Sequence, residues 1–150
     1  MLARLLIGVV ALCQLPFGLA ACGGDTGETQ LPVCLTDLDE ACTPNIPATF
    51  DSVYINVVLP TCGRTGEDTN CHSARKKQGG LDLSTPDRAY DGLLGEHGRA
   101  RVVPENPDCS VLMQRIEADD DTVRMPLGTL RLDPGLRCAI QQWIAAGAER

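Results

Sequence analysis

Aromatic residues are scarce in this chain of 150 residues, which has one Trp, two Tyr and two Phe. That scarcity excludes an interior built mainly from large rings and leaves a thin apolar core for a domain of this size. The chain has eight cysteines, and a set of cysteines in an oxidising compartment is typical of a disulfide framework. We therefore expect one small domain that depends on covalent cross-links.

An excess of basic residues is also absent, because 13 Lys and Arg stand against 20 Asp and Glu, for a net charge of −7. An acidic balance argues against nucleic acid or an anionic membrane surface as a partner. The sequence contains no G-x-S-x-G, H-E-x-x-H or phosphate-cradling glycine motif. We expect no catalytic constellation, and so we do not expect an enzyme.

The N-terminus is typical of a secreted, lipid-anchored protein. Arg4 precedes a short apolar run from Leu5 to Cys13, which predicts a signal peptide over residues 1–21. The ending Leu19-Ala20-Ala21-Cys22 resembles a bacterial lipobox, in which Cys22 would be acylated. Residues 22–47 would then form an anchor and tether segment, and Gly23 favours the outer membrane, on its periplasmic or surface face.

Four helices are expected, and no alternating strand pattern competes with them, so the fold class is all-α. Thr49 caps the first, from Phe50 to Leu59, which Pro60 ends. The second begins at Pro86 after Ser84 or Thr85. The third opens at Asn106-Pro107 and carries Cys109, and the fourth begins at Asp133-Pro134 with an apolar stripe: Leu136, Ala139, Ile140, Trp143 and Ile144.

Two sites far apart in sequence carry the chemistry. Cys71-His72 is the end of the C-x-x-C-H signature of covalent haem attachment, although eight residues separate Cys71 from Cys62. Met125 follows in a later loop, and His/Met ligation is one way in which proteins hold haem iron. Each residue also has a plainer interpretation: a Cys62–Cys71 disulfide, a surface loop for His72, and a gap-filling core methionine for Met125.

The order of these elements resembles class I cytochromes c, and four phrases resemble the planctomycete and myxobacterial type. The phrases are Gly79-Gly80-Leu81-Asp82-Leu83, Val102-Val103-Pro104-Glu105-Asn106-Pro107-Asp108, Arg124-Met125-Pro126-Leu127-Gly128 and Gln142-Trp143-Ile144-Ala145-Ala146-Gly147-Ala148. The resemblance implies a cytochrome c-like domain over residues 48–150 that binds haem c. Cys62 and Cys71 would form the thioethers, His72 would be the proximal ligand and Met125 the distal ligand.

Two functions from different classes follow. The first is an electron-transfer protein, lipid-anchored outside the cytoplasm and paired with a redox partner protein. The second is a haem-free, disulfide-stapled surface lipoprotein that serves as a binding or scaffold module. Zinc at Cys62, Cys71 and His72 ranks low because a fourth ligand is missing. His97 lies in a polar, glycine-flanked loop and is expected to be solvated.

The other four cysteines are expected to form disulfides. Local pairing, Cys34 with Cys42 and Cys109 with Cys138, is the interpretation we favour. One observation opposes it, because Cys138 lies roughly opposite the apolar stripe of its helix and so faces the outer side. From there it is placed to bond with the segment between Cys34 and Cys42 instead.

Overall fold

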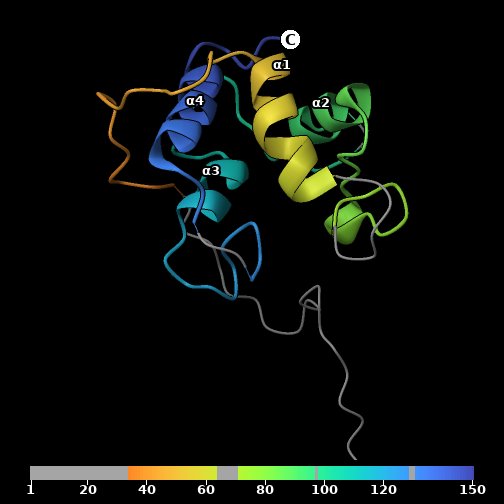
Figure 1. Ribbon diagram of the computed structural model, residues 1–150. Helices are drawn as coiled ribbons and strands as arrows, with labels where there is room; N and C mark the ends of the chain where they lie inside the picture. Colours follow the sequence, from red (N-terminus) through yellow and green to blue (C-terminus); the bar gives the residue numbers. More distant parts are fainter. Residues whose placement is uncertain (1–33, 64–70, 97, 129–130) are drawn as a thin grey trace, which may run out of the picture.

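The computed structural model describes residues 34–63, 71–96, 98–128 and 131–150, and within them the regular structure is entirely helical (Figure 1). The elements are α1 (Phe50–Val53), η1 (Tyr54–Gly63), η2 (Gln78–Gly80), α2 (Pro86–Leu94), α3 (Val111–Glu117) and α4 (Pro134–Ala145). The expected all-α fold is confirmed.

The first helix begins where the sequence predicts, but it does not end at Pro60. The Thr49 side chain accepts a hydrogen bond from the backbone N–H of Ser52 and caps α1. The chain then continues as the π-helix η1 through Pro60 to Gly63. A proline clashes with the carbonyl four residues before it in an α-helix, whereas a π-helix makes wider turns. The Thr61 hydroxyl also donates to the Val57 carbonyl at 2.6 Å.

The second and fourth helices begin as predicted. Thr85, and not Ser84, caps α2 by accepting from the backbone N–H of Arg88, and Pro86 takes the first helical position. Asp133 caps α4 by accepting from the backbone N–H of Gly135 at 2.8 Å. Both starts combine a capping oxygen with a proline whose missing N–H costs nothing there.

The third helix starts later than predicted, at Val111, so Cys109 lies before it. The Asn106 side chain accepts from the backbone N–H of Cys109 at 3.2 Å, and the Ser110 hydroxyl donates to the Asn106 carbonyl at 2.8 Å. Such local side-chain bonds offer the backbone an alternative to a helix. The segment from Asn106 to Ser110 is therefore a turn.

The core concentrates the few aromatic rings around Phe50, which is 1% exposed. The ring centroids of Tyr54, Tyr90 and Trp143 lie 5.9, 5.0 and 5.7 Å from that of Phe50. Aromatic pairs at such distances stabilise beyond their buried area. These four aromatic side chains therefore form one cluster, which joins α1, η1, α2 and α4.

The disulfides are long-range, so the prediction of local pairing is wrong. Cys34 bonds with Cys109 and Cys42 bonds with Cys138, across sequence separations of 75 and 96 residues. The alternative suggested by the position of Cys138 on its helix is confirmed, because its partner lies in the Cys34–Cys42 segment. That segment runs along α4 (Figure 1) and places Leu35 and Leu38 against the core.

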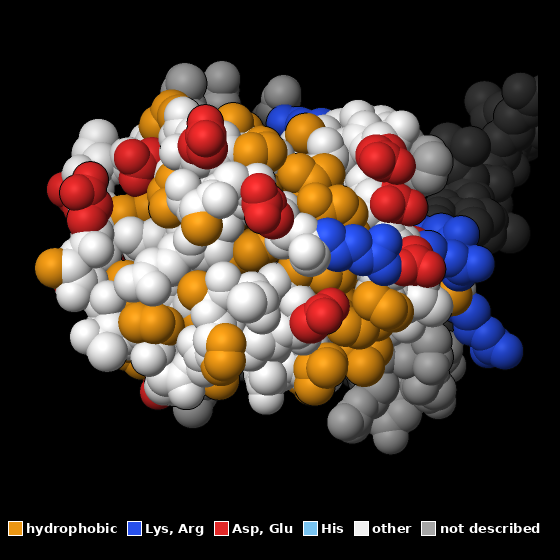
Figure 2. Space-filling view, turned by 90° about the horizontal axis from the view of Figure 1, so that it is seen from above, with side chains coloured by type: hydrophobic (Ala, Val, Ile, Leu, Met, Phe, Trp, Pro, Cys, Tyr) orange, Lys and Arg blue, Asp and Glu red, His pale blue; other side chains and the backbone are white. Residues whose placement is uncertain are grey.

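Seen from above, uncharged side chains and backbone make up most of the surface, acidic groups are scattered over it, and Lys and Arg gather toward one edge (Figure 2). Among the described residues, no helix combines the length and the apolar character needed to cross a membrane. The predicted signal peptide, Cys22 and His97 lie outside the described residues.

Candidate functional site

Cys62 and His72 lie together despite the long gap between them. The backbone N–H of His72 donates to the carbonyl of Cys62 at 3.2 Å. Cys62 comes from the end of η1, and His72 comes from the turn that follows residues 64–70. The described residues on either side of positions 64–70 are therefore joined by this hydrogen bond, and closure entropy grows slowly enough with loop length to allow it.

This hydrogen bond is the one that a C-x-x-C-H turn would make. In that signature the histidine follows the first cysteine by four residues, and a helical turn joins such an N–H to such a carbonyl. Here the same two backbone groups meet across a longer stretch of chain. The backbone hydrogen bond that the signature would form between Cys62 and His72 is therefore present despite the extra residues.

The backbone of Leu83 packs against both Gly63 and His72. The Leu83 N–H donates to the His72 carbonyl at 2.8 Å, and Leu83 is 4% exposed. A Cβ atom on Gly63 would lie only 2.0 Å from the Leu83 carbonyl oxygen. Residue 63 therefore has no room for a side chain, and the segment Gly79–Leu83 recognised in the sequence is a wall of the site.

The His72 ring is oriented by a backbone carbonyl. Its Nδ1 lies 3.0 Å from the Gln78 carbonyl oxygen, and because a carbonyl can only accept, Nδ1 carries the hydrogen. The Gln78 N–H in turn donates to the Cys71 carbonyl at 2.8 Å. Histidines that bind metals commonly donate their other ring N–H to a carbonyl or carboxylate, which fixes ring and tautomer.

The same surroundings keep the His72 imidazole neutral. Burial lowers its pKa below the ordinary value of 6.5, and the charges of Arg101 and Arg115 act in the same direction. Hydrogen bonds with the backbone of Gln78 and Leu81 oppose this shift without cancelling it. A neutral imidazole with its hydrogen on Nδ1 presents the lone pair of Nε2, the form that ligates a metal.

The two cysteines of the motif differ in their chemical state. Cys62 is a free, partly buried thiol, and burial raises its pKa, with a hydrogen bond between its side chain and that of Thr61 partly opposing the shift. Cys71 is disulfide-bonded. A Cys62–Cys71 disulfide, one of the interpretations left open by the sequence, is therefore not formed. Thioether chemistry at Cys71 first requires reduction of its disulfide.

Met125 belongs to the loop that follows α3 and is partly buried. Its backbone N–H donates to the Arg115 carbonyl at 2.9 Å, which ties the loop to the end of that helix. Next to it, Arg124 pairs with Asp121, yet the buried Nε of Arg124 has no hydrogen-bond partner. A buried donor without a partner is rare and points to a missing acceptor.

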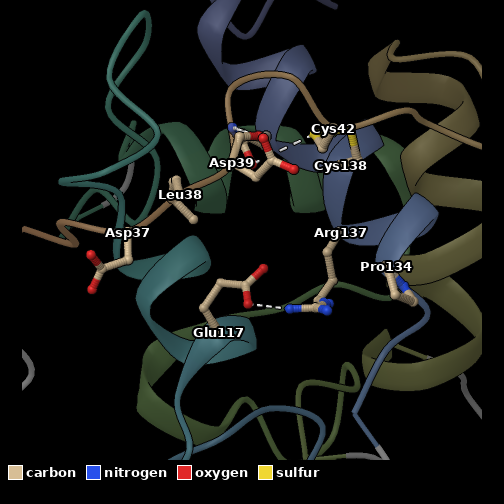
Figure 3. Close-up of a pocket in the computed structure, with 9 residues that line it drawn as sticks. Asp37, Leu38, Asp39, Cys42, Glu117, Pro134, Arg137 and Cys138 are labelled. Carbon is tan, nitrogen blue, oxygen red and sulfur yellow. Dashed lines mark hydrogen bonds and ion pairs between the residues drawn. A yellow bond between two sulfur atoms is a disulfide. The ribbon is translucent and has the colours of Figure 1, made fainter.

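A cavity of about 230 Å³ lies elsewhere, between the Cys34–Cys42 segment and α4 (Figure 3). The Cys42–Cys138 disulfide and the ion pair between Glu117 and Arg137 line it. The Gln141 amide, also in its lining, donates to the Asp39 carbonyl at 3.1 Å. These polar groups of the lining therefore already bind protein partners.

The structure thus places the Cys62 carbonyl against the His72 N–H and ties the Met125 loop to α3. Cys34, Cys42, Cys109 and Cys138 form the two structural disulfides. Sequence reasoning missed Gln78, Gly63 and Arg115 as parts of the site. The Gly79–Leu83 phrase was a signal that this stretch mattered, but no pattern showed that the Gln78 carbonyl would hold the histidine. In the described part of the chain, no group of three or more His, Cys, Asp and Glu residues is arranged to hold a metal ion.

Part of the chain matches a known protein family. Residues 69–126 match the family model described as Planctomycete cytochrome C. The matched stretch contains Cys71, His72 and Met125 and begins after Cys62. No curated protein and no solved structure matches the chain.

Proposed function

We propose that this chain, which contains a cytochrome c-like domain of the planctomycete type, is a lipid-anchored electron-transfer protein that carries one haem c with His72 and Met125 as axial ligands. The observation that carries the proposal is the hydrogen bond from the His72 N–H to the Cys62 carbonyl, because it keeps the backbone relation of the attachment signature. Bound haem would supply a one-electron Fe(III)/Fe(II) couple.

The donor set of the described residues fits haem at the axial positions. His72 is neutral and its Nδ1 is engaged by the Gln78 carbonyl, so Nε2 is the nitrogen that would ligate iron. A thioether sulfur such as that of Met125 is the usual partner of histidine in cytochromes c and raises the potential. Since both axial positions would be taken by protein, no open position is left for a substrate, and the protein is an electron carrier rather than an enzyme.

Of the two cysteines in the motif, one has a free thiol to which haem could be attached covalently. Cys62 has a free thiol beside His72, whereas Cys71 becomes available only after its disulfide is reduced. The raised pKa of the Cys62 thiol keeps it protonated at neutral pH and therefore weakly nucleophilic. Attachment in the cell accordingly depends on the reducing and ligating steps of a haem-c maturation system.

The location and partners belong to the same proposal. Acylation of Cys22 would hold the protein at the bacterial outer membrane, on the periplasmic or surface face, and a redox partner protein would exchange electrons with the haem edge. The disulfides Cys34–Cys109 and Cys42–Cys138 support an oxidising compartment.

The axial ligands are tested by replacement. The full chain is produced in a host with active haem-c maturation, and absorption spectra are recorded in the ferric and ferrous states for the wild type and Met125→Ala. We expect the loss of Met125 to change the spectrum and to lower the reduction potential. Met113→Leu is the matched control, because Met113 is a fully buried core residue of α3 and should leave the spectrum unchanged. An unchanged spectrum for Met125→Ala removes Met125 from the ligand set.

A further inference from the structure

Two partly buried arginines near the site have no acidic partner among the described residues, whereas Arg75 and Arg99, which have none either, are exposed. Arg88, Arg124, Arg131, Arg137 and Arg150 each pair with a carboxylate. Arg101 and Arg115 are partly buried, and in the described part of the chain they form hydrogen bonds only with carbonyl groups. The sequence has more acidic than basic residues, so a shortage of carboxylates does not explain this.

Arg101 stands on the histidine side of the site. Its guanidinium donates to the carbonyls of Gly79 at 2.6 Å and Gly92 at 3.2 Å, and also to that of Arg99. Gly79 directly follows Gln78, whose carbonyl holds the His72 ring. Burial lowers the pKa of Arg101 below its usual range, and the charge of Arg99 adds to this effect. Carbonyl dipoles solvate this cation but do not neutralise it.

Arg115 stands on the methionine side. Its guanidinium donates to the Val123 carbonyl at 3.1 Å, and its own carbonyl accepts from the Met125 N–H. The charges of Arg115 and Arg101 both lower the pKa of His72, so both cations act electrostatically on the site from different parts of the chain. Near Met125, the buried Nε of Arg124 is a further donor without an acceptor.

Partly buried charges are normally paired, because an uncompensated charge away from water is costly. A ligand with carboxylates of its own would supply what this site lacks. We propose that Arg101 and Arg115 are the counter-cations of the two haem carboxylates, with the Nε of Arg124 as an additional donor. The assignment rests on the proposed function, since it requires that haem occupy the site. Guanidinium groups suit carboxylates because they form two parallel hydrogen bonds with them.

The test compares haem with its carboxylates free and blocked. The full chain is purified without haem and titrated with ferric haem and with the dimethyl ester of ferric haem, following absorbance and Trp143 fluorescence. We expect wild type to bind free haem more tightly than the ester. Arg101→Gln and Arg115→Gln should each weaken the binding of free haem about tenfold to hundredfold, as loss of a charge-assisted bond implies, and leave ester binding nearly unchanged.

Matched variants separate charge from folding. Arg101→Lys and Arg115→Lys keep the charge and should restore most of the preference for free haem. Arg150→Gln removes an exposed arginine that pairs with Asp87, and it should change neither affinity. Thermal melting of each haem-free variant shows whether it still folds.

The outcomes distinguish this assignment from the proposed function. If wild type binds both forms equally, or if the glutamine variants lose both forms equally, the arginines are not carboxylate partners, although the protein still binds haem. If inorganic phosphate competes as strongly as the free carboxylates, the site is a general anion site and the assignment to haem is overturned. If neither form binds, the proposed function fails and this assignment fails with it.

Discussion

Replacing Gly63 by Ala should destabilise the protein at the turn that holds His72. The added Cβ would lie 2.0 Å from the Leu83 carbonyl oxygen and 2.6 Å from its carbonyl carbon. Both neighbours are backbone atoms of a buried residue, so no side chain can rotate away. The Leu83 main chain would have to retreat by about 1.5 Å to reach an ordinary van der Waals contact.

The magnitude follows from what that retreat disturbs. Overpacking in a close-packed interior costs about 1–3 kcal/mol. The Leu83 N–H also donates to the His72 carbonyl, and loss of such a hydrogen bond costs about 0.5–1.5 kcal/mol. We therefore expect Gly63→Ala to lower the free energy of unfolding by about 2–4 kcal/mol, a large part of the stability of a small domain.

The assay is urea unfolding of the haem-free protein, followed by the fluorescence of Trp143, which is 2% exposed and belongs to the core. Gly92→Ala, within helix α2, is the matched control, because its Cβ would closely approach the flexible end of the Leu81 side chain at 2.8 Å and would lie at an ordinary 4.0 Å from the Asp82 carbonyl oxygen. The control should change the free energy of unfolding by less than about 1 kcal/mol, since alanine is also the better helix former. A similarly small loss for Gly63→Ala would refute the packing of the turn described here.

Four further predictions concern the scaffold and the attachment motif. Replacing Cys42 and Cys138 together by Ser should lower the free energy of unfolding by about 2–5 kcal/mol, because the bond spans 96 residues; a urea midpoint within error of the wild type contradicts this. Phe50→Ala should cost about 3–5 kcal/mol in the same measurement, since three other rings pack on this side chain; a cost below about 1 kcal/mol would show that the cluster is not cooperative. Although burial alone would raise it, hydrogen bonds from Ser84 and the charges of Arg88 and Lys77 hold the pKa of Asp82 below its ordinary value of 3.8. The stability from Asp82 is therefore present above that value and lost as the pH falls through the lower folded pKa, so Asp82→Asn should flatten the acid side of the stability profile, and an unchanged slope would contradict the shift. Deleting residues 64–69 joins Cys62-Gly63 to Asn70-Cys71-His72 and creates a C-x-x-C-H signature, so the variant should fold and carry more covalent haem per chain than wild type; a variant that folds with no gain would show that spacing is not the barrier.

The sequence predicts best where a local rule acts alone. The starts of α2 and α4 follow from a capping oxygen and a proline at the first helical position, and both rules operate within one turn of helix. The end of the first helix could not be predicted in the same way. Pro60 normally stops an α-helix, and the π-helical path through it depends on tertiary packing of Val57 and Val58 in the core.

Contacts between residues far apart in the sequence could not be predicted from hydrophobic periodicity. The position of Cys138 on its helix correctly indicated a partner on the outer side, but the preference for local pairing came from spacing alone and is wrong. The closeness of Cys62 and His72 was likewise open, because a chain of that length can close in many ways. The role of the Gln78 carbonyl depends on where the η2 turn falls, which no side-chain pattern specifies.

The central claim is that this chain carries haem attached beside His72. The most direct test is the absorption spectrum of the full chain, purified from a host with active haem-c maturation and then unfolded in denaturant. The account predicts a haem band that stays with the polypeptide and is lost when Cys62 and Cys71 are both replaced by Ser. A wild-type protein with no haem band after denaturation would contradict it, and would leave a haem-free, disulfide-stapled domain with a binding role.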